Sequence, residues 1–337
     1  MMRPPARSRR ATILALAAWA AAGACAATMA LKGLRAHGYV FDMAANFAAH
    51  TAWVAAGLAV AAAALRRWGP AAVLGAVAVA HAAWLMPGRA PRAAASDGPG
   101  VTVVQFNALA ANRTPERVMA LVESSEADLI GIVEAPDALI EMIRGSESVR
   151  ARYPHQSWPT LADERNNVRL SKHPFEALDL VDRSNPADLR RYILGHTAVV
   201  DHPAGRFVHA LMVPASPRTP ALWAAGNADL ESELAVLAER IPERDLPWVV
   251  GIDMNGTPGS HRADIAAAAA GLVRAKPWRA GRGTWPSWAP PIFRFPIDDV
   301  LVSRGVRVRS WDVGEESAGS DHLPIVVDLI LDRPRTP

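Results

Sequence analysis

Six polar residues stand where apolar runs of the chain begin or end, and their side chains suit cation binding and proton transfer. They are Asn107, Glu134, Asp253, Asn255, Asp321 and His322. In a sandwich of sheets the ends of strands can converge on one edge, so side chains far apart in the sequence can share a pocket. Carboxylate and amide oxygens are ligands that Mg²⁺ prefers, and a histidine beside an acid can move protons. The pattern therefore predicts one polar site built from several strand ends.

Each of these residues also has an ordinary structural interpretation. Asn107 is typical of a turn, Glu134 is a loop acid shortly before Pro136, and Asp253–Gly256 is typical of a plain β-turn. The prediction of a functional site therefore depends on the ordered set and on no single member.

Together and in this order, the motifs resemble those of the endonuclease/exonuclease/phosphatase family, whose fold is described as DNase I-like. That family has an Asn ending its first strand, a metal-binding Glu, a Gly-Asp-x-Asn turn, an Ile-Asp-His segment and a terminal Ser-Asp-His. The matching stretches are Val104–Asn107, Ile132–Glu134, Gly251–Asn255, Ile297–Asp299 and Gly319–Pro324, and Thr284–Pro286 also fits. The resemblance covers nearly all of Val101 to Leu331 and implies an α/β fold, a four-layered α/β/β/α sandwich.

The resemblance also implies catalytic roles at the matching positions. Asp253 orients or deprotonates the attacking water, and Asn255 steadies that aspartate or the phosphate. His322 binds the phosphate or shares in proton transfer, while Asp298 fixes its tautomer. A plain salt bridge between Asp298 and His322 is the alternative.

A divalent cation, Mg²⁺ or Mn²⁺, is the cofactor that the resemblance implies. Its partial shell consists of Glu134, Asp321 and the amide oxygen of Asn107, and the cation offsets charge on the phosphate oxygens. Asn107 and Trp285 are the expected substrate-binding residues.

One histidine of the family pattern is missing. The family carries it at a strand end before a long helix, where it binds the scissile phosphate or helps the leaving group depart. Val213 takes that position here, and a valine neither donates a hydrogen bond nor moves a proton. His209 lies four residues upstream, roughly 13 Å along a strand, so it replaces the missing histidine only if a bulge or shifted register brings it closer.

Two smaller departures accompany this one. Asn166 and Arg169 occur where the family usually has Gly followed by apolar residues. Asp299 replaces a common His or aromatic residue, and as the neighbour of Asp298 in a strand it is expected to face the other way.

The elements that position these residues alternate β-rich runs with helical patterns. Expected strands are Val101–Phe106, Asp128–Val133, Arg206–Val213, Trp248–Ile252, Ile297–Ser303, Val306–Val313 and Pro324–Leu331. Expected helices begin after Thr114, with Pro115 in first position, span Leu222–Ile241, and follow Arg262. Such mixing of strands and helices is typical of a layered α/β sandwich.

The residues before Gly98 differ in composition from the rest. They contain ten Lys or Arg and two acids, a net charge of +8, so the chain from Gly98 onward carries −5 of the overall +3. An acidic second part argues against tight non-specific DNA binding, which depends on basic residues that neutralise phosphates. Three runs without Asp, Glu, Lys or Arg, namely Ala11–Leu31, Met43–Leu65 and Ala71–Met86, predict transmembrane helices, since about 20 residues span the hydrocarbon core.

Basic residues predict the topology of these helices. Arg3, Arg7, Arg9 and Arg10 precede the first run and Arg66–Arg67 follow the second, which places both segments in the cytoplasm. Three crossings then leave the remainder outside, although Lys32, Arg35, Arg89 and Arg92 fall on that side too. The expected location is the inner membrane, multi-pass, with a periplasmic or extracytoplasmic catalytic domain.

Two other interpretations of the first run stay open. Its basic start and small residues also fit a cleaved signal peptide. The single cysteine, Cys25, excludes an intrachain disulfide, and a lipoprotein signal lacks the larger aliphatic residue usual three positions before the modified cysteine. In the second run, Asn46 and His50 are expected to share a helical face and to form interhelical hydrogen bonds.

The predicted organisation is an anchor over residues 1–88, a linker over 89–100 and a catalytic domain over 101–337. The predicted function is that of a membrane-anchored, metal-dependent phosphoesterase acting outside the cytoplasm. Nucleic acid, a lipid head group or a small phosphodiester are the candidate substrates, and no obligate protein partner is evident. The alternative is a pseudoenzyme that keeps the fold and metal pocket for binding; transport by the anchor is disfavoured because it holds few charges.

Overall fold

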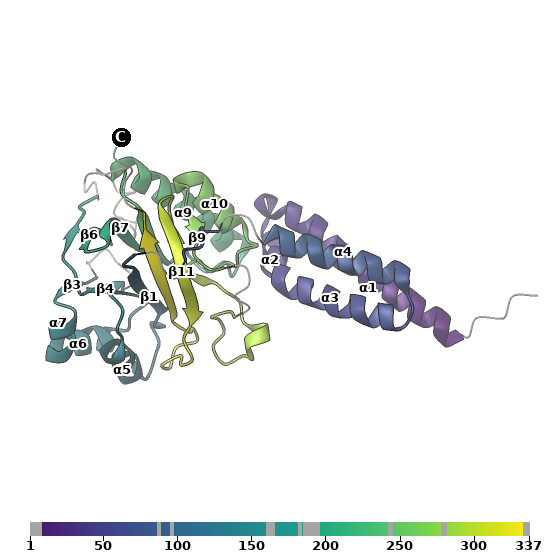
Figure 1. Ribbon diagram of the computed structural model, residues 1–337, viewed down its shortest axis with the longest axis horizontal. Coiled ribbons are helices and arrows are strands. Elements are labelled where there is room, and N and C mark those ends of the chain that lie inside the picture. The colour runs from purple at the N-terminus through teal and green to yellow at the C-terminus, as the bar shows by residue number, and fades with distance from the viewer. Residues whose placement is uncertain are drawn as a thin grey trace, which may run out of the picture. The chain divides into compact units, whose positions relative to one another are not determined.

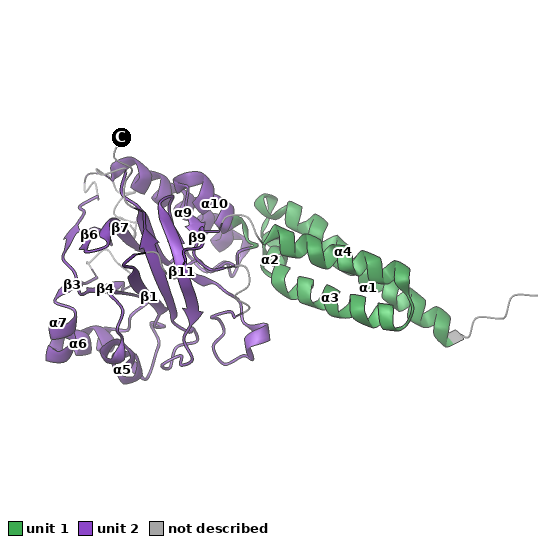
Figure 2. Ribbon diagram, viewed as in Figure 1, with its two compact units in different colours: residues 1–87, 259–261 green, residues 88–258, 262–337 purple. Residues whose placement is uncertain are grey.

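The computed structural model describes residues 9–85, 89–94, 98–159, 166–180, 184, 196–241, 245–277 and 282–332 (Figure 1). The chain divides into two compact units, residues 1–87 with 259–261 and residues 88–258 with 262–337 (Figure 2). Arg3 and Arg7, on which the predicted topology partly depends, lie outside the described residues, as do residues 86–88 and 95–97 around and within the predicted linker.

The first unit is helical. It consists of α1 (Arg9–Gly33), the short 3₁₀ turn η1 (Arg35–His37), α2 (Tyr39–Asn46), α3 (Ala48–Ala64) and α4 (Trp68–Trp84). Alanines let the helices approach closely: Ala22 of α1 and Ala55 of α3 are fully buried in one cluster with Leu74 of α4. Small residues at helix contacts are typical of packing inside membranes.

One helix among the described residues is long and apolar enough by itself to cross a membrane, residues 10–33 within α1. The predicted second span is not one straight helix, because α2 and α3 meet at a 56° bend and pass the same test only as a pair. Asn46 and His50 consequently lie on different helices, and the amide of Asn46 donates to the carbonyl oxygen of Asp42 within α2, 3.0 Å away. An asparagine side chain that bonds to nearby backbone competes with a regular helix. The third predicted span, α4, has only 17 residues.

The second unit contains two six-stranded sheets. The first has the order β11-β12-β1-β2-β4-β3. Its strands are β1 (Val101–Asn107), β2 (Leu129–Val133), β3 (His155–Ser157), β4 (Val168–Ser171), β11 (Val306–Val313) and β12 (Ile325–Leu331). The second has the order β5-β6-β7-β8-β10-β9. Its strands are β5 (Phe175–Ala177), β6 (Thr197–His202), β7 (Gly205–Met212), β8 (Trp248–Asp253), β9 (Val273–Arg274) and β10 (Asp298–Val302).

Helices cover the outer faces of both sheets (Figure 1). The first sheet packs against α5 (Pro115–Ser124), α6 (Asp137–Gly145) and α7 (Glu147–Arg152). The second packs against α9 (Pro220–Arg240) and α10 (His261–Ala270). Pro220 suits the first position of α9, and the hydroxyl of Thr219 caps it by accepting from the backbone N–H of Leu222 at 3.2 Å. The four-layered α/β/β/α sandwich predicted from the sequence is therefore confirmed.

Strand alternation decides which side chains face the space between the sheets. In β1, Val101 and Val103 join the core between the sheets, whereas Val104 and Phe106 pack toward the helices. The period of two therefore turns Gln105 and Asn107 inward. Gly251 of β8 accommodates Gln105, because a Cβ atom there would lie 2.1 Å from its Oε1.

The described part of the predicted linker is attached to the second unit. The backbone N–H of Ala90 donates to the carbonyl of Arg274 at 3.0 Å, and that of Ala93 donates to the carbonyl of Val308 at 2.8 Å. These residues therefore extend the edges of both sheets.

Candidate active site

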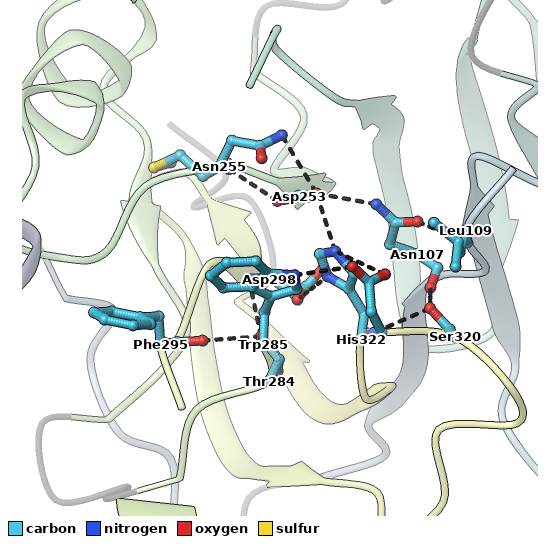
Figure 3. Close-up of polar contacts among 12 residues, drawn as sticks. Asn107, Leu109, Asp253, Asn255, Thr284, Trp285, Phe295, Asp298, Ser320 and His322 are labelled. Atoms are coloured by element: carbon cyan, nitrogen blue, oxygen red, sulfur yellow. Dashed lines mark hydrogen bonds and ion pairs between the residues drawn. The ribbon is translucent and has the colours of Figure 1, made fainter. Parts of the chain in front are cut away.

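Three strand ends bring the candidate residues together between the sheets. Asn107 ends β1, Asp253 ends β8 and Asp298 begins β10. Because β8 and β10 are antiparallel, Asp253 and Asp298 are direct partners in register. His322 comes from the loop before β12, and its ring points toward both acids (Figure 3).

His322 is hydrogen-bonded to an acid, as the motifs imply. Its Nδ1 lies 2.8 Å from Asp298 Oδ2, while its Nε2 lies 3.9 Å from Asp253 Oδ2 and 3.8 Å from Asp321 Oδ1. Asp253 and Asp298 are buried, and His322 is 6% exposed. A short bond at Nδ1 fixes the ring and leaves Nε2 directed at the other carboxylates.

The acids of the cluster shift each other's protonation. Burial and the negative charge of Asp298 together raise the pKa of Asp253 to about 7, although His322 opposes both. Burial lowers the pKa of His322, but the charges of Asp298 and Asp253 outweigh it and raise that pKa to about 10. At neutral pH His322 therefore keeps its proton, whereas Asp253 can gain or lose one. Environments that shift the pKa values of neighbouring groups in this way allow one group to act as an acid and the other as a base.

Two asparagines position the Asp253 carboxylate. The amide of Asn107 donates to Asp253 Oδ2 at 3.0 Å, and the backbone N–H of Asn255 donates to Oδ1 at 2.8 Å. The side-chain amide of Asn255 donates to the carbonyl of Pro214 at 3.1 Å, and Asn255 has a φ of +48°, which asparagine tolerates. Both asparagines therefore hold the acid that the motifs assign to water activation.

Ser320 is a positioning residue that the sequence interpretation missed. Its hydroxyl donates to the carbonyl of Asn107 at 2.8 Å and accepts from the backbone N–H of His322 at 3.0 Å. The serine thus ties the end of β1 to the histidine loop (Figure 3). Its position in the sequence, two residues before His322, was the feature that could have indicated this role.

Glu134, Asp321 and Trp285 lie around this buried cluster. Glu134 follows Val133, which pairs with Asn107, and its charge raises the pKa of Asp253. The indole Nε1 of Trp285 donates to Asp321 Oδ2 at 3.0 Å. The structure thus places all eight predicted site residues at one edge of the sandwich.

The polar atoms of this edge fit a hard cation. The buried Oδ1 atoms of Asp298 and Asp321 accept no hydrogen bond from the described residues. Nor does any described residue donate to the carboxylate of Glu134, which is half-buried at a φ of +51°. Asp253, Asp298 and His322 also have ligand atoms within 4.8 Å of one another, but two of these side chains already bind each other. Glu134 and Asp321 are therefore the carboxylates better suited to an ion.

A second group with a similar composition lies at the other end of β2. Asp128, His173 and His202 also bring ligand atoms within 4.8 Å of one another. The backbone N–H of Ala204, however, donates to Nδ1 of His202 at 3.0 Å, so in the neutral ring the proton sits on Nε2. That nitrogen faces Asp128 Oδ2 at 3.6 Å, an arrangement typical of a polar pair.

His209 does not replace the missing histidine. It is fully buried in the middle of β7, where its Nδ1 accepts from Arg169 Nε at 2.8 Å. Met212 pairs with Ile252 in the β7–β8 ladder, and Val213 is the next residue in the chain. Val213 therefore lies beside the end of β8, as the motifs imply. It packs with Val133 and Leu211. Asp299 is engaged elsewhere, accepting from Arg274 Nε at 2.7 Å and Trp311 Nε1 at 3.0 Å.

Solved structures share this fold at low sequence identity. An endonuclease/exonuclease/phosphatase protein from Bacteroides vulgatus is 18% identical with a TM-score of 0.53, covering 70% of this chain and 100% of its own. One from Beutenbergia cavernae DSM 12333 is 19% identical with a TM-score of 0.51, covering 70% and 73%. A mannosyl-6-phosphatase from Bacteroides thetaiotaomicron VPI-5482 is 14% identical with a TM-score of 0.50, covering 68% and 100%.

A comparison with curated proteins found no match. The model of the Endonuclease/Exonuclease/phosphatase family matches residues 104–322, a range that contains every residue of the candidate site. The chain therefore belongs to the endonuclease/exonuclease/phosphatase family.

Proposed function

We propose that the chain is a divalent-metal-dependent phosphoesterase in which Asp253 activates water and His322 binds the phosphate. Members of this family hydrolyse phosphate esters and generally use a divalent metal. The observation that carries the proposal is the cluster of Asp298, His322 and Asp253, joined by a 2.8 Å bond and a 3.9 Å approach at one strand-end edge.

The residues divide the reaction between them. Asp253, held by Asn107 and Asn255, accepts a proton from the water whose oxygen attacks phosphorus. Protonated His322, held by Asp298, donates from Nε2 to a phosphate oxygen and stabilises the charge that develops there. The ester bond to the leaving alcohol breaks, and solvent supplies that alcohol's proton. A divalent cation would be held by Glu134 and Asp321, and by the amide oxygen of Asn107 through the lone pair that the backbone N–H of Leu109 does not use; when bound it would offset the phosphate charge.

The proposal extends to location. The helix over residues 10–33 supports membrane anchoring, and the basic residues that flank the apolar runs support a catalytic unit outside the cytoplasm. A pseudoenzyme is not favoured, because the polar contacts expected of a working site are formed. The fold alone does not decide between a phosphomonoester and a phosphodiester substrate, because a mannosyl-6-phosphatase has a similar fold.

Hydrolysis by the full chain in detergent micelles tests the proposal. Bis(p-nitrophenyl) phosphate, p-nitrophenyl phosphate and plasmid DNA are offered with Mg²⁺, Mn²⁺ or EDTA. We expect metal-dependent turnover that falls about 10²- to 10⁴-fold in Asp253→Asn. Glu134→Gln is expected to require more metal for half-maximal rate, because it removes a charged oxygen ligand.

Asp201→Asn is the matched control, since Asp201 is half-exposed and pairs with Arg206 at 2.7 Å. It should retain the rate of the parent. Binding of Mg²⁺ by calorimetry without hydrolysis of any of the three esters would sink the enzyme proposal and leave binding as the function.

A further inference from the structure

The most exposed apolar side chains of the second unit gather beside the active site. Among its described residues, six large apolar side chains are exposed, and four of them belong to one segment. These four are Trp285, Trp288, Ile292 and Phe293, with Trp288 80% and Ile292 73% exposed. We call residues 284–295 the aromatic loop. The other two, Met142 and Leu222, lie on separate helices, α6 and α9.

The aromatic loop is held in shape by hydrogen bonds. The backbones of Trp285 and Phe295 exchange two bonds, and the Nε of Arg294 donates to the carbonyl of Ala289 at 2.7 Å. Residues 291–293 form the short 3₁₀ turn η3. The apolar side chains are therefore displayed by an ordered segment that stays folded while they face water.

The base of the aromatic loop is part of the active site. The indole of Trp285 donates to Asp321, and the backbone N–H of Ser287 donates to the carbonyl of Asp321 at 2.7 Å. Asp321 precedes His322 in the chain. A surface bound by Trp288, Ile292 and Phe293 would consequently lie next to the catalytic groups.

The composition of the loop indicates which surface it binds. Residues 284–297 contain no acid, and exposed Arg282 and half-buried Arg294 flank the apolar side chains. Tryptophan and phenylalanine beside arginine are typical of segments that lie at the boundary between acyl chains and phosphate head groups. The same chain carries a helix long and apolar enough to cross a membrane, so a bilayer is the apolar phase that the proposed anchor would bring within reach of the loop.

We propose that the aromatic loop inserts into a lipid bilayer and that the substrate is a phospholipid head-group phosphodiester at its surface. This inference rests on the proposed phosphoesterase function. Water attacks phosphorus and gives a proton to Asp253, one of the two ester bonds breaks, the released alkoxide takes a proton from solvent, and a phosphomonoester remains.

A spectroscopic experiment tests insertion without requiring catalysis. The full chain carries Cys25→Ala and either Ile292→Cys or Leu222→Cys, labelled with an environment-sensitive fluorophore and reconstituted in phosphatidylcholine–phosphatidylglycerol nanodiscs. Lipids with a nitroxide on the acyl chain should quench the label at 292 by more than half and leave the label at 222 nearly unchanged. Equal quenching at both sites overturns the proposal. A fluorescence shift of the label at 292 that depends on protein concentration and not on lipid also overturns it, because the loop would then bind a second copy of the chain.

A kinetic experiment tests the substrate class. In the same nanodiscs, Trp288→Ser/Phe293→Ser is compared with Met142→Ser/Leu222→Ser, which removes the two other exposed apolar side chains. Phosphomonoester formation from the lipids, followed by ³¹P NMR, should fall at least tenfold in the loop variant only. Hydrolysis of bis(p-nitrophenyl) phosphate should stay within about twofold in both.

The outcomes separate the two proposals. Turnover of the soluble diester without any lipid cleavage overturns the lipid substrate and leaves the phosphoesterase in place. No turnover of either ester defeats both the enzyme and its lipid substrate, while quenching at 292 still decides whether the loop inserts.

Discussion

His322 and His209 are both buried in the second unit, but their partners carry opposite charge. His322, at the end of the sandwich, has Nδ1 2.8 Å from the carboxylate of Asp298. His209, in the middle of β7, accepts at Nδ1 from the guanidinium of Arg169, also at 2.8 Å. Burial lowers the pKa of His322, but the acids outweigh it and raise that pKa to about 10. Burial and the nearby Arg169 lower the pKa of His209 well below its ordinary value.

The comparison separates a site that can do chemistry from one that joins two sheets. Arg169 belongs to β4 of the first sheet, and its guanidinium also donates to the carbonyl oxygens of His196 and His209 in the second. Its Nε and Nη2 donors are therefore used by the ring of His209 and by two backbone carbonyls. Around His322 the surplus consists of acceptors, including the buried Oδ1 atoms of Asp298 and Asp321. Surplus acceptors at a strand-end edge favour a cation and a phosphate, whereas a guanidinium bonded to acceptors across the interface holds the two sheets together.

Replacing each histidine by glutamine is the strongest test of this comparison. In His322→Gln we expect kcat for bis(p-nitrophenyl) phosphate to fall about 10²- to 10⁴-fold, because the amide cannot release a proton and carries no positive charge. In His209→Gln the rate should stay within about threefold, because the glutamine oxygen can still accept from Arg169. Steady-state kinetics of the full chain at saturating Mg²⁺ measures both.

Thermal unfolding of both variants serves as the control. Both should remain folded at the assay temperature, so that a lost rate reports on chemistry. A loss of equal size in both variants would remove the distinction between the two histidines.

Much of the site could be predicted from the sequence, because its residues occupy fixed places at strand ends. The period of two in β1 and the pairing of β8 with β10 leave little freedom for Asn107, Asp253 and Asp298. The partners of Arg169 could not be predicted, since they lie across the interface between sheets. Ser320 was missed for a related reason, because its role depends on a carbonyl 213 residues away in the chain.

The fold shows the same division. Long periodic strands and the helices α5, α9 and α10 were expected within a few residues of their bounds. The short strands β3, β5 and β9 have two or three residues each and carry too little pattern to recognise. The bend between α2 and α3 was also missed, because no Pro or Gly marks the break and Asn46 beside it was interpreted as an interhelical contact.

The second test of the comparison is the response of stability to acid. The folded ring of His209 stays neutral, whereas in the unfolded chain it takes a proton below its ordinary pKa of 6.5. Only the unfolded state binds that proton, so the stability His209 contributes is present above pH 6.5 and lost as pH falls. Because the unfolded ring is already half protonated at pH 6.5, the loss between pH 6.5 and 5.5 amounts to about 1 kcal/mol. His209→Gln has no such proton, so its free energy of unfolding should fall by about that much less.

Urea unfolding of the full chain in detergent, followed by tryptophan fluorescence at both pH values, measures the difference. Other groups that titrate in this range are common to parent and variant and cancel. Identical pH dependence in the two proteins would mean that His209 is protonated in the folded state, contrary to its bond with Arg169.

Val213→His gives the smallest expected effect, and it places a histidine at the end of the strand whose middle holds His209. Val213 packs with Val133 and Leu211, and neither can orient an imidazole as Asp298 orients His322. We therefore expect the rate on bis(p-nitrophenyl) phosphate to change by less than about threefold, with a loss of about 1–2 kcal/mol in stability from burying a polar ring without a partner. Val213→Ala is the control for packing alone. The opposite result would be an inactive parent in which Val213→His, but not Val213→Ala, gains metal-dependent turnover. That result would show that catalysis needs a proton donor at this strand end. The difference that decides activity would then be the one between acid-bound His322 and apolar Val213.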